Sequence, residues 1–152
     1  MSKQATIERI SRQSTSNVGI FMQNFIRLIQ LFRGHIDSAA FEDVNGKLNT
    51  ARRVLQCDRE LVDYVYGYFL RFEKEISENN DRAMLEFDYT TLIVPNCEQN
   101  TKELILTLID NIKTAYSKGN EELNSKIRNT VKALAKHARI HQDLKDLMTK
   151  FN

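Results

Sequence analysis

The sequence predicts an all-α fold, a single-domain helical bundle over residues 1–152 with about five main helices around a central hydrophobic helix. Apolar residues recur every three or four positions over several long segments, which is the spacing of a one-sided helix. The chain contains only five glycines and one proline, fewer turn formers than a β-sandwich or barrel needs. One segment is apolar around most of its circumference, so other helices must enclose it.

The central helix is expected over residues 59–78. Its broad apolar face consists of Leu61, Val62, Val65, Tyr68, Phe69, Phe72 and Ile76. Tyr64, Tyr66 and Leu70 extend the apolar surface beyond this face, which makes them candidate contacts with a partner. Only a narrow polar seam, which includes Asp63 and Arg71, is left for solvent.

The first helix is expected over residues 5–33. Its inner stripe consists of Val18, Phe21, Met22, Phe25, Leu28, Ile29 and Phe32. The serines and threonine at 14–16 favour caps and turns, so a break there is an alternative, with residues 1–16 as a separate or loosely ordered segment. Ile20 and Leu31 lie on the opposite side of this helix and are candidate partner contacts if they are exposed.

A second helix is expected over residues 39–56. Gly34 should end the first helix, and Asp37 or Ser38 should cap the second. Asp58 then caps the central helix after a very short corner. So short a connection makes neighbouring helices antiparallel or sharply bent, which places the second helix beside the central one.

The segment after the central helix is the least regular part of the chain. Residues 79–81 are predicted to form a turn followed by a helix cap. Residues 82–94 begin with helix-forming side chains and end in a β-branched run before Pro95. We expect a helix that loosens into an extended connector packed on the core.

Two further helices are expected in the C-terminal third. Asn96 and Gln99 have the spacing of a capping box, and the helix they begin should run to about Ser117 and stop at Gly119. The last helix should be capped by Asn120. Its predicted inner stripe consists of Leu123, Ile127, Val131, Leu134, Ala138 and Met148.

Charge is segregated along the chain although the formal net charge is only +2. Residues 1–36 carry five basic side chains and one acidic one, and residues 123–152 carry seven basic and two acidic ones. Residues 37–122 carry seventeen acidic and ten basic side chains. We expect the basic terminal helices to pack against the acidic middle of the same molecule.

The last helix carries the most specific candidate for a binding surface. Arg128, Lys132, Lys136 and Arg139 fall within about 80° of one another, opposite the apolar stripe. Such a basic face is suited to the phosphates of a nucleic-acid backbone, without reading sequence. A solvated face, an acidic partner, or the acidic middle of this chain are the alternatives.

The two histidines of that helix are weak candidates for chemistry. His137 and His141 are four apart, as in helical metal sites, but Ala138 stands where a zinc protease has its glutamate, and no third ligand is spaced nearby. His141 falls on the apolar stripe, which favours a hydrogen-bonded core histidine. Phosphotransfer through His141, assisted by Lys145, is disfavoured because the His141 side chain is predicted to face the core.

The sequence therefore favours a non-catalytic helical subunit of a larger assembly, with a protein partner or self-association. Nucleic-acid backbone binding is the alternative. No motif for an enzyme, a cofactor or a metal is found. Two cysteines 40 positions apart, no apolar run of membrane-spanning length and no secretory h-region lead us to expect an intracellular, cytoplasmic location.

Overall fold

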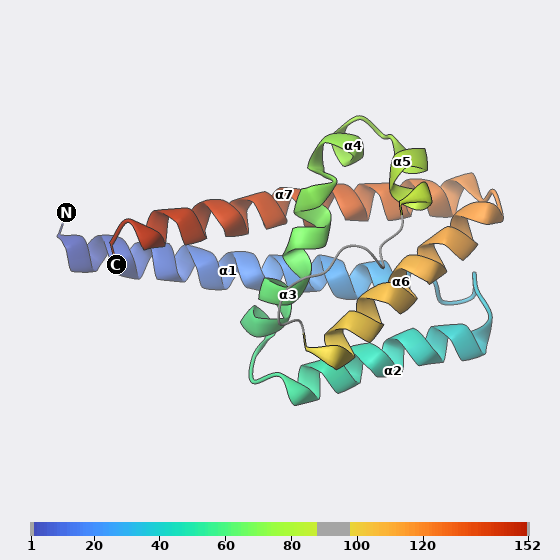
Figure 1. Cartoon of the computed structure of the whole chain (residues 1–152), viewed down its shortest axis with the longest axis horizontal. Helices are drawn as coiled ribbons and strands as arrows, with labels where there is room; N and C mark the ends of the chain where they lie inside the picture. The colour runs from blue at the N-terminus through green and yellow to red at the C-terminus, as the bar shows by residue number, and fades with distance from the viewer. Residues whose placement is uncertain (1, 88–97, 152) are drawn as a thin grey trace.

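The computed structural model describes residues 2–87 and 98–151, and these residues are helical with no strand (Figure 1), which confirms the predicted all-α fold. The helices are α1 (Lys3–Gln30), α2 (Ser38–Val54), α3 (Asp58–Arg71), α4 (Glu73–Ser77), α5 (Asp81–Glu86), α6 (Gln99–Ser117) and α7 (Glu121–Thr149). None of the described helices combines the length and the apolarity that a membrane span needs.

α1 and α7 form the long axis of the molecule. They lie side by side and antiparallel, so the two ends of the chain are close together (Figure 1). α1 is continuous, and no break occurs at residues 14–16. Thr15 donates its hydroxyl to the carbonyl of Ser11, and the Arg59 guanidinium donates to the hydroxyls of Ser14 and Thr15. These bonds occupy the polar groups that would otherwise favour a turn.

α3 crosses this pair and contacts α1, α2, α6 and α7 (Figure 1). Leu61, Val62 and Val65 are completely buried, as the pattern predicts for the central helix. The predicted helix over 59–78 is nevertheless interrupted at Phe72, where φ is −107° and ψ is 20°. The Phe72 ring stays buried and packs edge-on against Phe87, with ring centroids 5.1 Å apart.

The remaining helix ends follow the predictions in part. Gly119 follows α6 with a positive φ of 67°, the conformation that ends a helix. α1 instead ends at Gln30, before the predicted stop at Gly34, although Gly34 also has a positive φ of 78°. Asn80 and Asn120 accept backbone N–H bonds at the starts of α5 and α7. Cys57, and not the predicted Asp58, is the N-cap of α3, and the Asp58 carboxylate accepts two bonds from Arg52.

α6 begins with a cap that the sequence pattern missed. Its N-cap is Glu98, whose carboxylate accepts the backbone N–H groups of Asn100 and Thr101 at 2.9 and 3.0 Å. The predicted cap, Asn96, lies outside the described residues, as does most of the predicted connector over 82–94. α6 ends at Ser117 as predicted.

Candidate functional site

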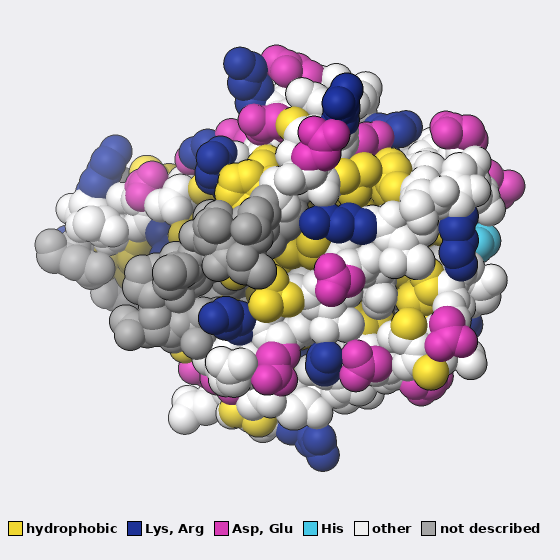
Figure 2. All heavy atoms as spheres, turned by 45° about the vertical axis from the view of Figure 1, so that its right-hand side comes forward, with side chains coloured by type: hydrophobic (Ala, Val, Ile, Leu, Met, Phe, Trp, Pro, Cys, Tyr) yellow, Lys and Arg dark blue, Asp and Glu magenta, His cyan; other side chains and the backbone are white. Residues whose placement is uncertain are grey.

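An apolar cleft opens between the α3–α5 segment and the helices α6 and α7. Its walls are Tyr68, Phe69, Phe72 and Ile76 from α3, α4 and their junction, Met84 and Leu85 from α5, Ile105, Leu108, Ile109, Ile112 and Tyr116 from α6, and Ile127 and Val131 from α7. The cleft holds about 820 Å³ of empty space, including its open mouth. Figure 2 shows hydrophobic side chains at the surface on the side of the molecule where α4, α5 and α6 meet.

Besides its apolar walls, the described lining includes the polar groups of Asp81, Lys113 and Arg128 and the hydroxyls of Tyr68 and Tyr116. Arg128 donates from Nε and Nη2 to one oxygen of Asp81, Oδ2, at 3.2 and 2.8 Å. Burial, and then the nearby charge of Asp81, raises the pKa of Tyr116 to about 12. This phenol therefore stays protonated near neutral pH, and it donates to the carbonyl of Asn124 at 3.4 Å.

Two of the four residues of the predicted basic face are engaged by acidic residues of this chain. Arg128 pairs with Asp81 of α5, and Arg139 makes a two-bond pair with Glu73 of α4 at 3.0 and 2.8 Å. The hydrogen bonds from Arg139 lower the pKa of Glu73. The basic last helix therefore packs against the acidic middle segment, as the charge segregation predicts.

Lys132 and Lys136 have no ion pair within the part of the chain that the structure describes, and Lys136 is exposed. The four basic side chains do not act as one free track, because the two arginines are turned toward α4 and α5. The ion pairs with Asp81 and Glu73 therefore offset the repulsion between the like charges on this face of α7.

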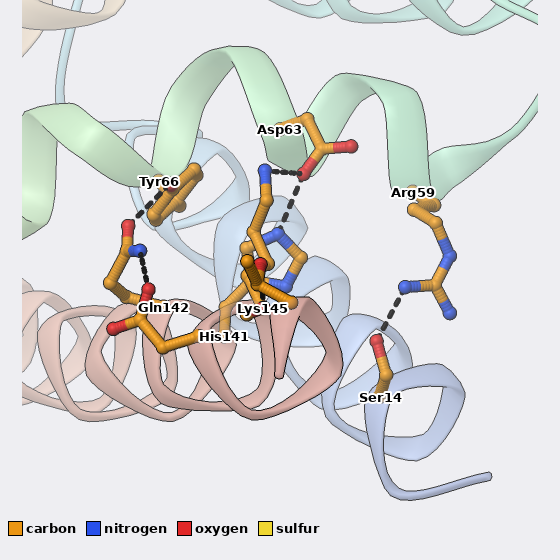
Figure 3. Close-up of polar contacts among 9 residues, drawn as sticks. Ser14, Arg59, Asp63, Tyr66, His141, Gln142 and Lys145 are labelled. Atoms are coloured by element: carbon orange, nitrogen blue, oxygen red, sulfur yellow. Dashed lines mark hydrogen bonds and ion pairs between the residues drawn. The ribbon is translucent and has the colours of Figure 1, made fainter. Parts of the chain in front are cut away.

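A polar network joins α3 to α1 and α7 (Figure 3). Asp63 Oδ1 lies 2.7 Å from His141 Nε2 and 3.0 Å from Lys145 Nζ. Tyr66 donates its hydroxyl to Gln142 at 2.7 Å, and its ring meets the His141 imidazole edge-on, with centroids 4.7 Å apart. Asp63 of the predicted polar seam therefore takes part in an interhelical contact.

Burial raises the pKa of Asp63, but the bonds from His141 and Lys145 outweigh burial, and the net effect is a lowered pKa. His141 is only 1% exposed, and its Nδ1 is buried without a hydrogen-bond partner. The prediction of a hydrogen-bonded core histidine is confirmed. Because the His141 imidazole is buried, a phosphoryl donor cannot reach it.

His137 is held by a different helix. Its Nδ1 lies 2.7 Å from Asn17 Oδ1, and Asn17 Nδ2 donates to the His137 carbonyl at 2.9 Å. Burial, together with the charge of Lys136, lowers the pKa of His137. The two histidines thus bind α1 and α3 separately, and among residues 2–87 and 98–151 no group of three side chains is placed to hold a metal.

The five candidate interface residues differ in their exposure. Ile20 is 38% exposed, whereas Leu31, Tyr64, Tyr66 and Leu70 are half-buried and pack against the core.

Neither the cleft nor the Asp63–His141 contact is predicted by the sequence patterns. The cleft walls come from five helices, so no single periodic pattern reveals them. In the sequence, only the predicted inward orientation of His141 and the polar seam of α3 pointed to the Asp63–His141 pair.

No family model, curated protein or solved structure matches this chain.

Proposed function

We propose that this chain is a non-catalytic helical subunit of a larger assembly, and that it docks another protein through the apolar cleft. The observation that carries this proposal is the half-buried state of large apolar side chains in the lining, among them Phe69, Leu85, Ile109 and Ile112. Burying such surface is favourable by about 25 cal/mol per Å². Exposed apolar patches of this kind mark interaction sites.

A partner helix or loop fits this cleft better than a reacting substrate does. Among the lining groups, Asp81 Oδ2 is paired with Arg128, and the pKa of Tyr116 is raised to about 12, so this phenol is protonated near neutral pH. The Asp63–His141 pair belongs to the α3–α7 contact and is not among the lining residues. The remaining lining is suited to burying apolar side chains of a partner.

Nucleic-acid backbone binding through α7 is the alternative function, and the geometry favours it less. Two of its four charges, Arg128 and Arg139, already form charge-assisted hydrogen bonds with Asp81 and Glu73. Binding to phosphate would have to break these pairs or depend on Lys132 and Lys136 alone. Each lost phosphate contact reduces the electrostatic gain from released counterions.

Site-specific photo-crosslinking in the cells that make this protein tests the docking proposal. A photoreactive phenylalanine derivative replaces Ile112 in the cleft in one variant. In the control variant it replaces Val54, which is 53% exposed at the end of α2 and outside the cleft. We expect one discrete adduct with a different protein from position 112 and none from position 54.

A second change makes the crosslinking result specific. Ile109→Glu places a charge in the cleft wall and should abolish the adduct from position 112, while circular dichroism verifies that the helices persist. The same adducts from both positions, no adduct from position 112, or an adduct that survives Ile109→Glu would each refute docking through the cleft.

A further inference from the structure

α7 carries a second apolar stripe on the side turned away from α3. Ala133, Ile140 and Leu147 are spaced seven residues apart and so lie within about 40° of one another. Gln142, which bonds Tyr66 of α3, points about 180° away from Ala133. Leu147 is 41% exposed, and the other two are half-buried. Seven-residue spacing is the spacing of helices that pack along their length.

α1 adds apolar surface beside this stripe. The two bonds between Asn17 and His137 fix the register of the antiparallel pair α1 and α7. Ile20 follows Asn17 by almost one turn and therefore lies at the level of residues 133 and 134. Its 38% exposure makes Ile20 and Leu147 two of the three large hydrophobic residues that the described surface exposes.

Two opposite charges flank the stripe. Lys136 and Asp143 are both exposed and lie on the same side of α7 as Ile140. Lys136 has no ion pair among the described residues, and Asp143 lies 3.9 Å from Arg139, at the outer limit of an ion pair. Each charge is thus available to a partner that presents the opposite charge.

We infer that the occupant of this stripe is a second copy of the chain, with the two α7 helices packed antiparallel about a two-fold axis at Ile140. Residues equally far before and after Ile140 then face each other. Ala133 meets Leu147 of the second copy, so that a small side chain accommodates a large one. Lys136, four residues before Ile140, comes beside Asp143 of the second copy, three residues after it, and symmetry forms this pair twice.

The antiparallel direction follows from the charges. Parallel helices in register would place Lys136 against Lys136 and Asp143 against Asp143, and like charges at such positions are destabilising. The self-contact also leaves the apolar cleft open, because the stripe faces away from α3. Self-association through α7 and docking of another protein through the cleft are therefore compatible and separate.

Sedimentation equilibrium of the full chain tests this inference. We expect a concentration-dependent dimer, with a dissociation constant that Leu147→Lys raises by at least about tenfold, because a desolvated apolar contact is lost twice. Val54→Lys is the matched control, since Val54 is 53% exposed and lies outside the stripe. It should leave the dissociation constant unchanged.

A charge exchange tests the register. Lys136→Glu and Asp143→Lys should each raise the dissociation constant by about three- to tenfold, because each places like charges opposite one another at two symmetric sites. The double variant should restore it to within about twofold of the unmodified protein. A monomer at every concentration, equal effects of Leu147→Lys and Val54→Lys, loss of the dimer with Ile109→Glu in the cleft, or no restoration in the double variant would overturn the inference.

Discussion

At the scale of single residues, the pair formed by Asp63 and His141 is asymmetric. The Asp63 carboxylate is partly exposed and keeps a second partner, Lys145. His141 is buried, and Asp63 is the partner of its Nε2. A buried polar atom that loses its partner retains its full desolvation cost, whereas an exposed one binds water. The two partners should therefore respond differently to substitution.

We expect Asp63→Ala to lower the free energy of unfolding by about 1–3 kcal/mol, because it leaves His141 Nε2 buried without a partner. His141→Leu should cost less, since it removes the buried polar group and leaves Asp63 with Lys145 and water. Urea unfolding monitored by circular dichroism measures both changes. Lys145→Ala, at an exposed ion pair, should cost no more than about 1 kcal/mol. A larger loss from His141→Leu than from Asp63→Ala would contradict this account.

At the level of the helices, polar side chains cap the starts of several elements. Asn80 and Asn120 cap α5 and α7, and Glu98 caps α6. Each supplies an acceptor to backbone N–H groups that have no partner within the first turn of the helix. α1 is capped by Ser2, and farther along, its serine-rich stretch is also supported from outside by Arg59 of α3.

The cap at Glu98 gives a prediction for α6. Glu98→Ala should lower the free energy of unfolding by about 1 kcal/mol, because the N–H groups of Asn100 and the buried Thr101 lose their acceptor. Gln99→Ala is the neighbouring control, because its exposed side chain bonds only the side chain of Glu103, and it should cost less than about 0.5 kcal/mol. Equal losses in urea unfolding would refute the assignment of the cap.

For the molecule as a whole, acid should lower the stability through four titratable groups. The pKa values of Asp63, Glu73, Glu98 and His137 are all lowered by folding. The unfolded chain therefore binds protons at a higher pH than the folded chain at every one of these groups. The free energy of unfolding must therefore fall as the pH falls through the pKa values of each of these groups.

We expect the free energy of unfolding to fall as the pH drops below about 6.5, from His137, and again as it drops below about 4.5, from the three carboxylates. At alkaline pH the sign reverses, because folding raises the pKa of Tyr116 to about 12 and stability should decline above about pH 10. Urea unfolding from pH 3 to 11 measures the profile. His137→Gln should flatten the step below pH 6.5, and a rise in stability between pH 7 and 5 would refute it.

Local sequence patterns are sufficient to predict the helical class and most helix positions, because a 3.6-residue period and a capping side chain depend only on neighbouring residues. The sequence predicted the buried face of α3, the end of α6 at Ser117 and Gly119, and the inward orientation of His141. It also predicted that the basic ends would meet the acidic middle.

Only the tertiary structure decided which helix faces meet and what is left between them. The Asp63–His141 contact joins positions 78 apart, and the Arg128–Asp81 and Arg139–Glu73 pairs join positions 47 and 66 apart. The interruption at Phe72 and the cleft likewise arise where several helices pack. A helical period fixes the direction of a side chain around its own axis, but crossing and packing between helices decide what that side chain reaches.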